Sequence, residues 1–271
     1  LKVRTKATTQ MGIDRTHSGL LIENAASMER GEERAMFWWK AAIRGLVLAG
    51  VVAGFLNPAH GGYESLFVDV QKAAWAIYVR GVGGMQAVCS ATAYQTTPEY
   101  TRLITAGHCF IGNDLKRTDF LVTQDHRTFR KADMVKSGLS PRKGTTARSS
   151  DLDDYEGHDW AIVQAQIGSQ ATLPIGRASE LTIGEDIVIV GVPFGVDFLA
   201  VQGIVGSKDI SLSRLVWNHY FGANVFVAGG NSGSAVISTK QRAIVGIVNA
   251  GPGSASSMMI FAPIDKVEFP K

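Results

Sequence analysis

The sequence predicts an all-β fold, and three observations lead to that class. The chain of 271 residues is 45% hydrophobic and contains 30 glycines, a composition that favours many short strands joined by tight turns. Short runs rich in valine, isoleucine and aromatic residues follow residue 62, and clusters of glycine, asparagine, aspartate and proline separate them. Little helical periodicity accompanies these runs. Strands of this kind are typical of antiparallel barrels.

The predicted strands differ in length but share this composition. In chain order they are Ala74–Val79, Gln86–Thr92, Arg102–Thr105, Phe120–Thr123, Trp160–Ala165, Asp186–Val192, Gly203–Ser207, Ser234–Ser238, Ala243–Val248 and Met258–Phe261. One long stretch, Ser137–His158, lacks this pattern and is basic at first and then acidic. We therefore expect an irregular surface insertion there.

Residues 1–61 are predicted to be a leader that precedes one domain, residues 62–271. Residues 45–56 contain no charge, and Lys40 and Arg44 provide a positive flank. Twelve apolar residues are too few to span a bilayer comfortably but suit a signal peptide, so we expect a secreted or periplasmic protein. A retained membrane anchor and a buried core helix are the alternatives. Leu1 stands where an initiator methionine is expected, which suggests that translation starts at Met28 or Met36.

The charge distribution argues against a nucleic-acid partner. The leader carries eight lysines or arginines and five acidic residues, whereas the rest of the chain carries nineteen of each. The net charge of +3 therefore belongs to the leader, and the main domain has no basic surface by composition.

Cys89 and Cys109 are the only two cysteines of the chain. In an exported protein such a pair predicts a disulfide, and two buried free thiols in a cytosolic protein are the alternative. Two cysteines cannot form a zinc site alone, and the adjacent His108 is expected to point elsewhere if its segment is extended. We therefore predict no metal site and no cofactor.

Three motifs that are well separated in the chain contain the residues of a serine hydrolase. His108 lies in Thr-Ala-Gly-His-Cys after an apolar run, and Asp159 begins an apolar strand after His158. Ser232 lies in the glycine-rich segment Gly-Gly-Asn-Ser-Gly-Ser, residues 229–234. Each motif alone is commonly structural, but the three together are specific. The acids at residues 151–156 lie in polar sequence, whereas Asp159 enters an apolar strand where burial makes its charge effective.

These residue types fit nucleophilic catalysis. A serine hydroxyl is a weak nucleophile, so a histidine must take its proton, and a buried carboxylate must hold that histidine in one tautomer. The glycines around Ser232 allow the backbone to direct the N–H groups of Gly230 and Ser232 at one point, where an oxyanion would form.

The order His, Asp, Ser resembles that of the chymotrypsin-like serine proteases, and the chain is most similar to their HtrA/Do-like branch. Three further segments, residues 120–129, 181–205 and 243–264, resemble that branch, and the resemblance covers about residues 75–268. It implies two six-stranded antiparallel β-barrels. It also implies that His108 is the general base, Asp159 its orienting acid and Ser232 the nucleophile, with Gly230 and Ser232 forming the oxyanion hole.

Other features of the chain depart from the wider family. Asn231 stands where trypsins have an aspartate that pairs with a newly cut N-terminus, so activation by that route is not expected. The Cys89 and Cys109 pair resembles the disulfide that brackets the trypsin histidine and is unusual in the HtrA-like branch. The sequence ends at Lys271, so we expect the PDZ domains of that branch to be absent.

The resemblance further implies a substrate pocket without a carboxylate. Its expected walls are Val227, Ala228, Gly229, Asn249, Ala250 and Gly251. Such a pocket would favour a small or medium uncharged side chain before the scissile bond of a polypeptide.

We therefore expect a serine endopeptidase that works through an acyl-enzyme and needs no cofactor. A catalytically inactive binding module of the same fold is one alternative. A membrane-tethered processing protease from a larger polyprotein, for example a viral one, is another, attached through residues 45–56. An α/β-hydrolase esterase is rejected, because Ser234 breaks the Gly-x-Ser-x-Gly motif and the chain order is wrong. The sequence leaves the oligomeric state open.

Overall fold

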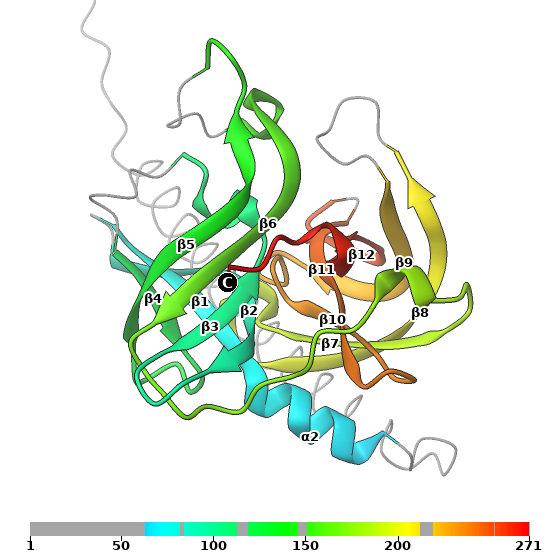
Figure 1. The fold of residues 1–271 in the computed structure, drawn as a ribbon, viewed down its shortest axis with the longest axis horizontal. Helices are drawn as coiled ribbons and strands as arrows, with labels where there is room; N and C mark the ends of the chain where they lie inside the picture. Colours follow the sequence, from blue (N-terminus) through cyan, green and yellow to red (C-terminus); the bar gives the residue numbers. More distant parts are fainter. Residues whose placement is uncertain are drawn as a thin grey trace, which may run out of the picture. The chain divides into compact units, whose positions relative to one another are not determined.

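The computed structural model describes residues 63–81, 84–112, 119–145, 151–211, 219–251 and 253–270. Over these residues the chain forms two closed antiparallel barrels of six strands each, which confirms the predicted double-barrel fold (Figure 1). The predicted leader, residues 1–61, and its apolar segment 45–56 lie outside the described residues.

The first barrel has the strand order β1-β2-β3-β6-β5-β4. Its strands are β1 (Ala74–Gly81), β2 (Gly84–Thr96), β3 (Thr101–Thr105), β4 (Asp119–Thr123), β5 (Arg130–Pro141) and β6 (Tyr155–Ala165). The strands β3 and β6, which lead into the two halves of the site described below, are direct neighbours, with Thr105 opposite Ala161.

The second barrel has the strand order β10-β11-β12-β9-β8-β7. Its strands are β7 (Asp186–Gly191), β8 (Leu199–Ile210), β9 (Tyr220–Ala228), β10 (Ala235–Ser238), β11 (Ala243–Ala250) and β12 (Ala255–Pro263). Short 3-10 helices punctuate the connections: η2 (Gly107–Phe110), η3 (Leu152–Asp154), η4 (Ala178–Glu180), η5 (Pro193–Gly195) and η6 (Ile264–Lys266).

Inward-facing aliphatic residues fill both barrels. Strand β11 is buried along nearly its whole length, and β7 is buried except at its first residue. Buried and exposed side chains alternate more clearly in β9, where Asn224 and Phe226 face outward between buried neighbours. Burial of these side chains supplies the main driving force for closing each barrel.

Three elements differ from the sequence-based expectation. Strand β5 is absent from the predicted set, and the irregular stretch expected over Ser137–His158 is wrong at both ends, because β5 runs to Pro141 and β6 begins at Tyr155. Strand β5 carries charged side chains on its exposed positions, so its sequence shows only a weak apolar pattern. Its pairing with both β4 and β6 makes it a strand in spite of that weak pattern. Strand β9 is also absent from the prediction, because Gly222 and Asn224 interrupt its apolar run.

The third difference is helix α2 (Glu64–Ala73), which precedes the first barrel (Figure 1). Its buried side chains are Leu66, Val70 and Ala73, so they lie on one face at helical spacing. No helix among the described residues is both long and apolar enough to cross a bilayer.

Candidate active site

His108 lies on the short helix η2, directly after strand β3. The preceding Gly107 makes the turn possible, because a Cβ there would lie 3.0 Å from both a Leu139 methyl group and the Trp160 carbonyl. The His108 backbone N–H donates to Asp159 Oδ1 at 2.7 Å, and its ring Nδ1 lies 2.7 Å from Asp159 Oδ2. Both oxygens of one carboxylate therefore hold this histidine.

Asp159 is fully buried on strand β6, and residues of the second barrel brace its backbone. Its N–H donates to the Tyr220 hydroxyl at 2.7 Å, and its carbonyl accepts from Asn249 Nδ2 at 2.7 Å. Asn249 Oδ1 in turn accepts from the Ala262 N–H at 2.7 Å. The acid is thus fixed in direction from β9 and β11 as well as from its own strand.

Mutual electrostatic stabilisation shifts the ionisation of this pair. Burial by itself lowers the pKa of His108, but the charge and hydrogen bond of Asp159 outweigh it and hold the pKa above its ordinary value. Burial by itself raises the pKa of Asp159, but His108 outweighs it and the pKa is lowered. The arrangement therefore favours an ionised carboxylate beside an imidazole that readily accepts a proton.

Ser232 lies in a tight loop between β9 and β10, which we call the Ser232 loop, residues 229–234. Gly230 and Gly233 have φ of +99° and +85°, a region that only glycine enters readily. A Cβ on Gly230 would overlap the Val192 carbonyl, and one on Gly233 would overlap the Ser90 carbonyl. Both glycines are therefore required by the close approach of the loop to other backbone.

Hydrogen bonds orient two peptide units of the Ser232 loop. The Gly229 carbonyl accepts from the Phe194 N–H at 2.6 Å, and the Asn231 carbonyl accepts from the Ser234 N–H at 3.0 Å. In a trans peptide the N–H points opposite to the C=O, so the N–H groups of Gly230 and Ser232 face away from these partners. Among the backbone hydrogen bonds of the described residues, none uses either N–H.

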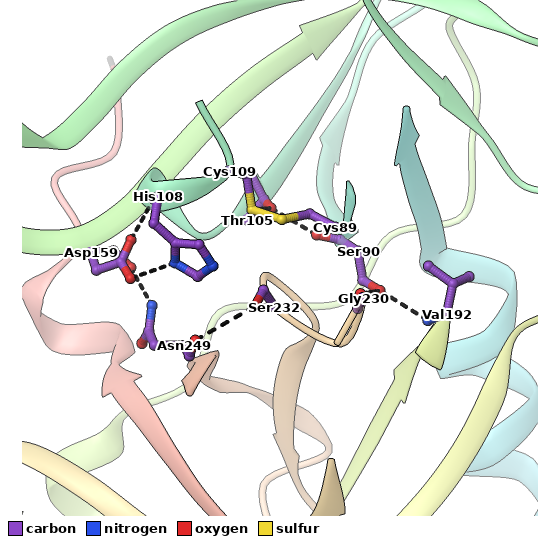
Figure 2. The surroundings of a disulfide bond; sticks show 10 residues. All are labelled: Cys89, Ser90, Thr105, His108, Cys109, Asp159, Val192, Gly230, Ser232 and Asn249. Atoms are coloured by element: carbon purple, nitrogen blue, oxygen red, sulfur yellow. Dashed lines mark hydrogen bonds and ion pairs between the residues drawn. A yellow bond between two sulfur atoms is a disulfide. The ribbon is translucent and has the colours of Figure 1, made fainter. Parts of the chain in front are cut away.

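Ser232 lies near His108 without bonding to it. The Ser232 carbonyl accepts from the Ser90 N–H at 2.8 Å, and Cys89, the neighbour of Ser90, forms a disulfide with Cys109, the neighbour of His108. In Figure 2 the imidazole is drawn between Asp159 and Ser232. Ser232 Oγ donates to the Asn249 carbonyl at 3.5 Å, and the hydrogen bonds of the described residues include none between Ser232 and His108.

The six residues expected to form a substrate pocket line one cavity of about 240 Å³ beside Ser232. The lining consists of Val227, Ala228, Gly229, Ser232, Val248, Asn249, Ala250, Gly251 and Gly253. None of these side chains is charged. The Asn249 amide is occupied by its two hydrogen bonds, so it contributes shape to the wall and braces Asp159.

The histidine segment is a 3-10 turn, so the extended conformation on which the expected direction of His108 depended does not occur. One ring nitrogen of His108 and the sulfur atoms of Cys89 and Cys109 therefore lie within 4.8 Å of one another. The two sulfur atoms are bonded to each other, so this group offers no thiolate to a metal ion.

Two supporting residues, Tyr220 and Ser90, are absent from the sequence-based prediction of the site, and a third, Asn249, was predicted only in a different role. Tyr220 and Asn249 orient Asp159, and Ser90 contacts the Ser232 loop. Tyr220 lies in the unpredicted strand β9, and Asn249 was expected only as pocket wall. Ser90 is one of a few polar residues within an apolar strand, which is the only sequence signal that could have indicated it.

Comparison with known proteins identifies relatives over most of the two barrels. Residues 89–247 match the family described as a trypsin-like peptidase domain. A probable periplasmic serine endoprotease, DegP-like, from Hahella chejuensis is 27% identical over 154 residues, which are 56% of this chain and 32% of that protein. A protein of the same description from Pseudomonas fulva is 26% identical over 133 residues, 49% of this chain and 27% of that protein.

Solved structures of the same class share the fold. The HtrA-type protease AlgW with a tripeptide has a TM-score of 0.58 at 18% identity, covering 74% of this chain and 59% of that one. The AlgW structure with a decapeptide has a TM-score of 0.57 at 17% identity, covering 74% and 63%. This chain spans about a third of the length of the curated relatives it matches.

Proposed function

This chain belongs to the family of trypsin-like peptidase domains, and we propose from that premise that it is a serine endopeptidase with His108, Asp159 and Ser232 as its catalytic triad. The observation that carries the proposal is that the Asp159 carboxylate is fully buried and that both of its oxygens accept hydrogen bonds from His108. A buried charge is costly unless it is paired, so a carboxylate committed wholly to one histidine indicates a task for that histidine.

In the proposed reaction, His108 takes the proton from Ser232 Oγ as the oxygen attacks the carbonyl carbon of the scissile peptide bond. Asp159 keeps the imidazole proton on Nδ1, so Nε2 is the nitrogen that accepts. The N–H groups of Gly230 and Ser232 stabilise the oxyanion of the tetrahedral intermediate. His108 then protonates the leaving amine, and the acyl group remains on Ser232.

Deacylation repeats these steps with water in place of the amine. His108 takes a proton from the water, the hydroxide oxygen bonds to the acyl carbon, and the ester bond to Ser232 breaks. Ser232 regains its proton from His108, and a carboxylate product leaves. No metal or organic cofactor enters this scheme.

The cavity beside Ser232 supports a preference for a small or medium uncharged side chain before the scissile bond. Val227 and Val248 offer apolar walls, and no carboxylate is present to pair with lysine or arginine. A Cβ on Gly251 would lie 2.9 Å from Val227 Cγ2, so the cavity is narrow at that point. Apolar pockets of this kind discriminate by roughly 1–3 kcal/mol per methylene.

We further propose that the protein acts outside the cytoplasm, after residues 1–61 have directed its export or tethered it to a membrane. The relatives named above are described as periplasmic, and the disulfide fits an oxidising compartment. The domain of residues 62–271 would then be the catalytic part. Its natural substrate would be a polypeptide.

Labelling with a serine-directed fluorophosphonate, followed by peptide mapping, tests the proposal. We expect the label on Ser232 in the wild type and no label in Ser232→Ala, which should also lose peptide hydrolysis. Labelling at another serine, or equal hydrolysis by both proteins, would overturn the triad assignment. A folded wild type that binds peptides without labelling or cleavage would instead be an inactive binding module.

A further inference from the structure

Ser90 on strand β2 is fully buried, and its three polar groups make four hydrogen bonds to residues in and around the site (Figure 2). Its hydroxyl donates to the Gly230 carbonyl at 2.8 Å and accepts from the Val192 N–H at 3.0 Å. Its backbone N–H donates to the Ser232 carbonyl at 2.8 Å, and its carbonyl accepts from Thr105 Oγ1 at 2.7 Å.

The hydroxyl of Ser90 closes a ring of contacts around the Gly229–Gly230 peptide. From Ser90 Oγ the ring passes to Val192 and along the chain to Phe194. The Phe194 N–H then donates to the Gly229 carbonyl at 2.6 Å. The carbonyl of the next residue, Gly230, accepts from Ser90 Oγ and so completes the ring. Gly230 is therefore fixed from both sides, at the peptide before it and at the peptide after it.

This double restraint matters because Gly230 has no side chain to fix its conformation. Its φ of +99° lies in a region that glycine can leave easily, and the Gly230 N–H rotates with the peptide that carries it. Phe194 itself has φ of +55°, which a non-glycine residue holds only when its surroundings impose it. The Ser90 hydroxyl is one atom that restrains both segments.

We propose that Ser90 is a positioning residue that aims the Gly230 N–H at the oxyanion. This inference rests on the proposed function, because it assigns a task within that reaction. Ser90 touches neither substrate nor reacting atoms and acts through Gly230. Removing its hydroxyl leaves the part-buried Gly230 carbonyl and the buried Val192 N–H without their partner, and the Gly230 peptide is then free to turn toward another donor.

The test compares two variants of the full chain that each delete one buried hydroxyl from strand β2. Ser90→Ala removes the proposed restraint. Thr92→Val is the matched control, because Thr92 is equally buried and its Oγ1 accepts from the Ala235 N–H at 3.3 Å, a contact to the second barrel outside the Ser232 loop. For both variants we would measure the melting temperature, kcat and KM on a fluorogenic peptide, and the Ki of a peptide boronic acid, which mimics the tetrahedral intermediate.

We expect Ser90→Ala to lower kcat and boronate affinity together by roughly tenfold to thirtyfold, with KM within about twofold. This is less than the loss of a whole oxyanion donor, which costs roughly a hundredfold to a thousandfold. Thr92→Val should lower the melting temperature comparably while kcat stays within about twofold. Equal kcat in Ser90→Ala and wild type, or parallel losses in both variants, would overturn the proposal.

Two further measurements keep the inference separable from the proposed function. If the wild type shows no hydrolysis, the proposed function fails. A crystal structure of Ser90→Ala then tests the positioning role by itself: a rotated Gly230 peptide supports that role, and an unchanged peptide refutes it. If Ser90→Ala does not fold, Ser90→Thr retains the hydroxyl. A kcat within about threefold of wild type then supports the proposal, and a tenfold loss at normal melting temperature contradicts it.

Discussion

Replacing Asp159 by asparagine tests the centre of the proposed site with almost no change of shape. Asp159 accepts two hydrogen bonds from His108, one from the backbone N–H and one from the ring. An asparagine can accept only with Oδ1. The backbone N–H of His108 is always a donor, so Oδ1 must face it, and the new Nδ2 then faces the ring Nδ1.

That arrangement forces His108 into the wrong tautomer. Nδ1 must accept from the asparagine amide, so the ring proton moves to Nε2, which can no longer take a proton from Ser232. The opposite amide orientation would place two donors 2.7 Å apart and is unfavourable. We expect kcat to fall by about 10⁴ near neutral pH with KM little changed, the size of loss that a wrong tautomer produces in a serine triad.

The assay is steady-state hydrolysis of a fluorogenic peptide by Asp159→Asn and by the control Asp153→Asn, which makes the same chemical change on an exposed acid nearby. The control should stay within about twofold of wild type. In addition, His108 in a Ser232→Ala background should titrate at a lower pKa once Asp159 is asparagine, since burial then acts alone. A fall in kcat of less than tenfold, or an unchanged His108 pKa, would refute the reasoning.

Three more predictions concern pH, the disulfide and the pocket. Because only neutral His108 accepts a proton and its pKa is raised, kcat/KM should increase with pH through an apparent pKa above 6.5; a midpoint below that value in a pH–rate profile would contradict this. Replacing Cys89 and Cys109 by alanine opens a loop of sequence separation 20, which gives the unfolded chain more conformational entropy. The free energy of unfolding, measured by urea titration, should fall by about 3 kcal/mol, and a loss under about 1 kcal/mol would contradict this entropic explanation. Gly251→Val should lower kcat/KM for peptides with leucine before the scissile bond more than for those with alanine, and equal losses for both would show that the cavity does not bind that residue.

The barrel class could be predicted because the core strands have strong local patterns, whereas the division into two six-stranded barrels was implied by the family resemblance. Strands such as β7 and β11 are nearly uninterrupted runs of aliphatic residues, which is how a strand buried on both faces appears in sequence. Strand β5 could not be predicted in this way, because the charges on its exposed positions hide a pattern that only its partners β4 and β6 complete. Helix α2 did leave a signal, since Leu66, Val70 and Ala73 follow helical spacing.

The candidate site was predictable where chemistry lies in short motifs. His108, Asp159 and Ser232 each occupy a recognisable local sequence, and so do the glycines beside Ser232. Their supports were not predictable, because they act through backbone atoms of residues distant in the chain. Tyr220 reaches the Asp159 N–H across 61 positions, and Ser90 reaches the Gly230 carbonyl across 140.

The bracing of Asp159 from the second barrel has a consequence during synthesis. A nascent chain that has emerged only as far as β6 already contains the histidine and the acid, but Tyr220, Ser232 and Asn249 are still to be made. The acid receives its last brace from β11, which leaves the ribosome after ten other strands of the two barrels. A polypeptide-cutting centre assembled in this order stays inert until most of both barrels has been synthesised, so a chain interrupted before that point cannot damage its neighbours.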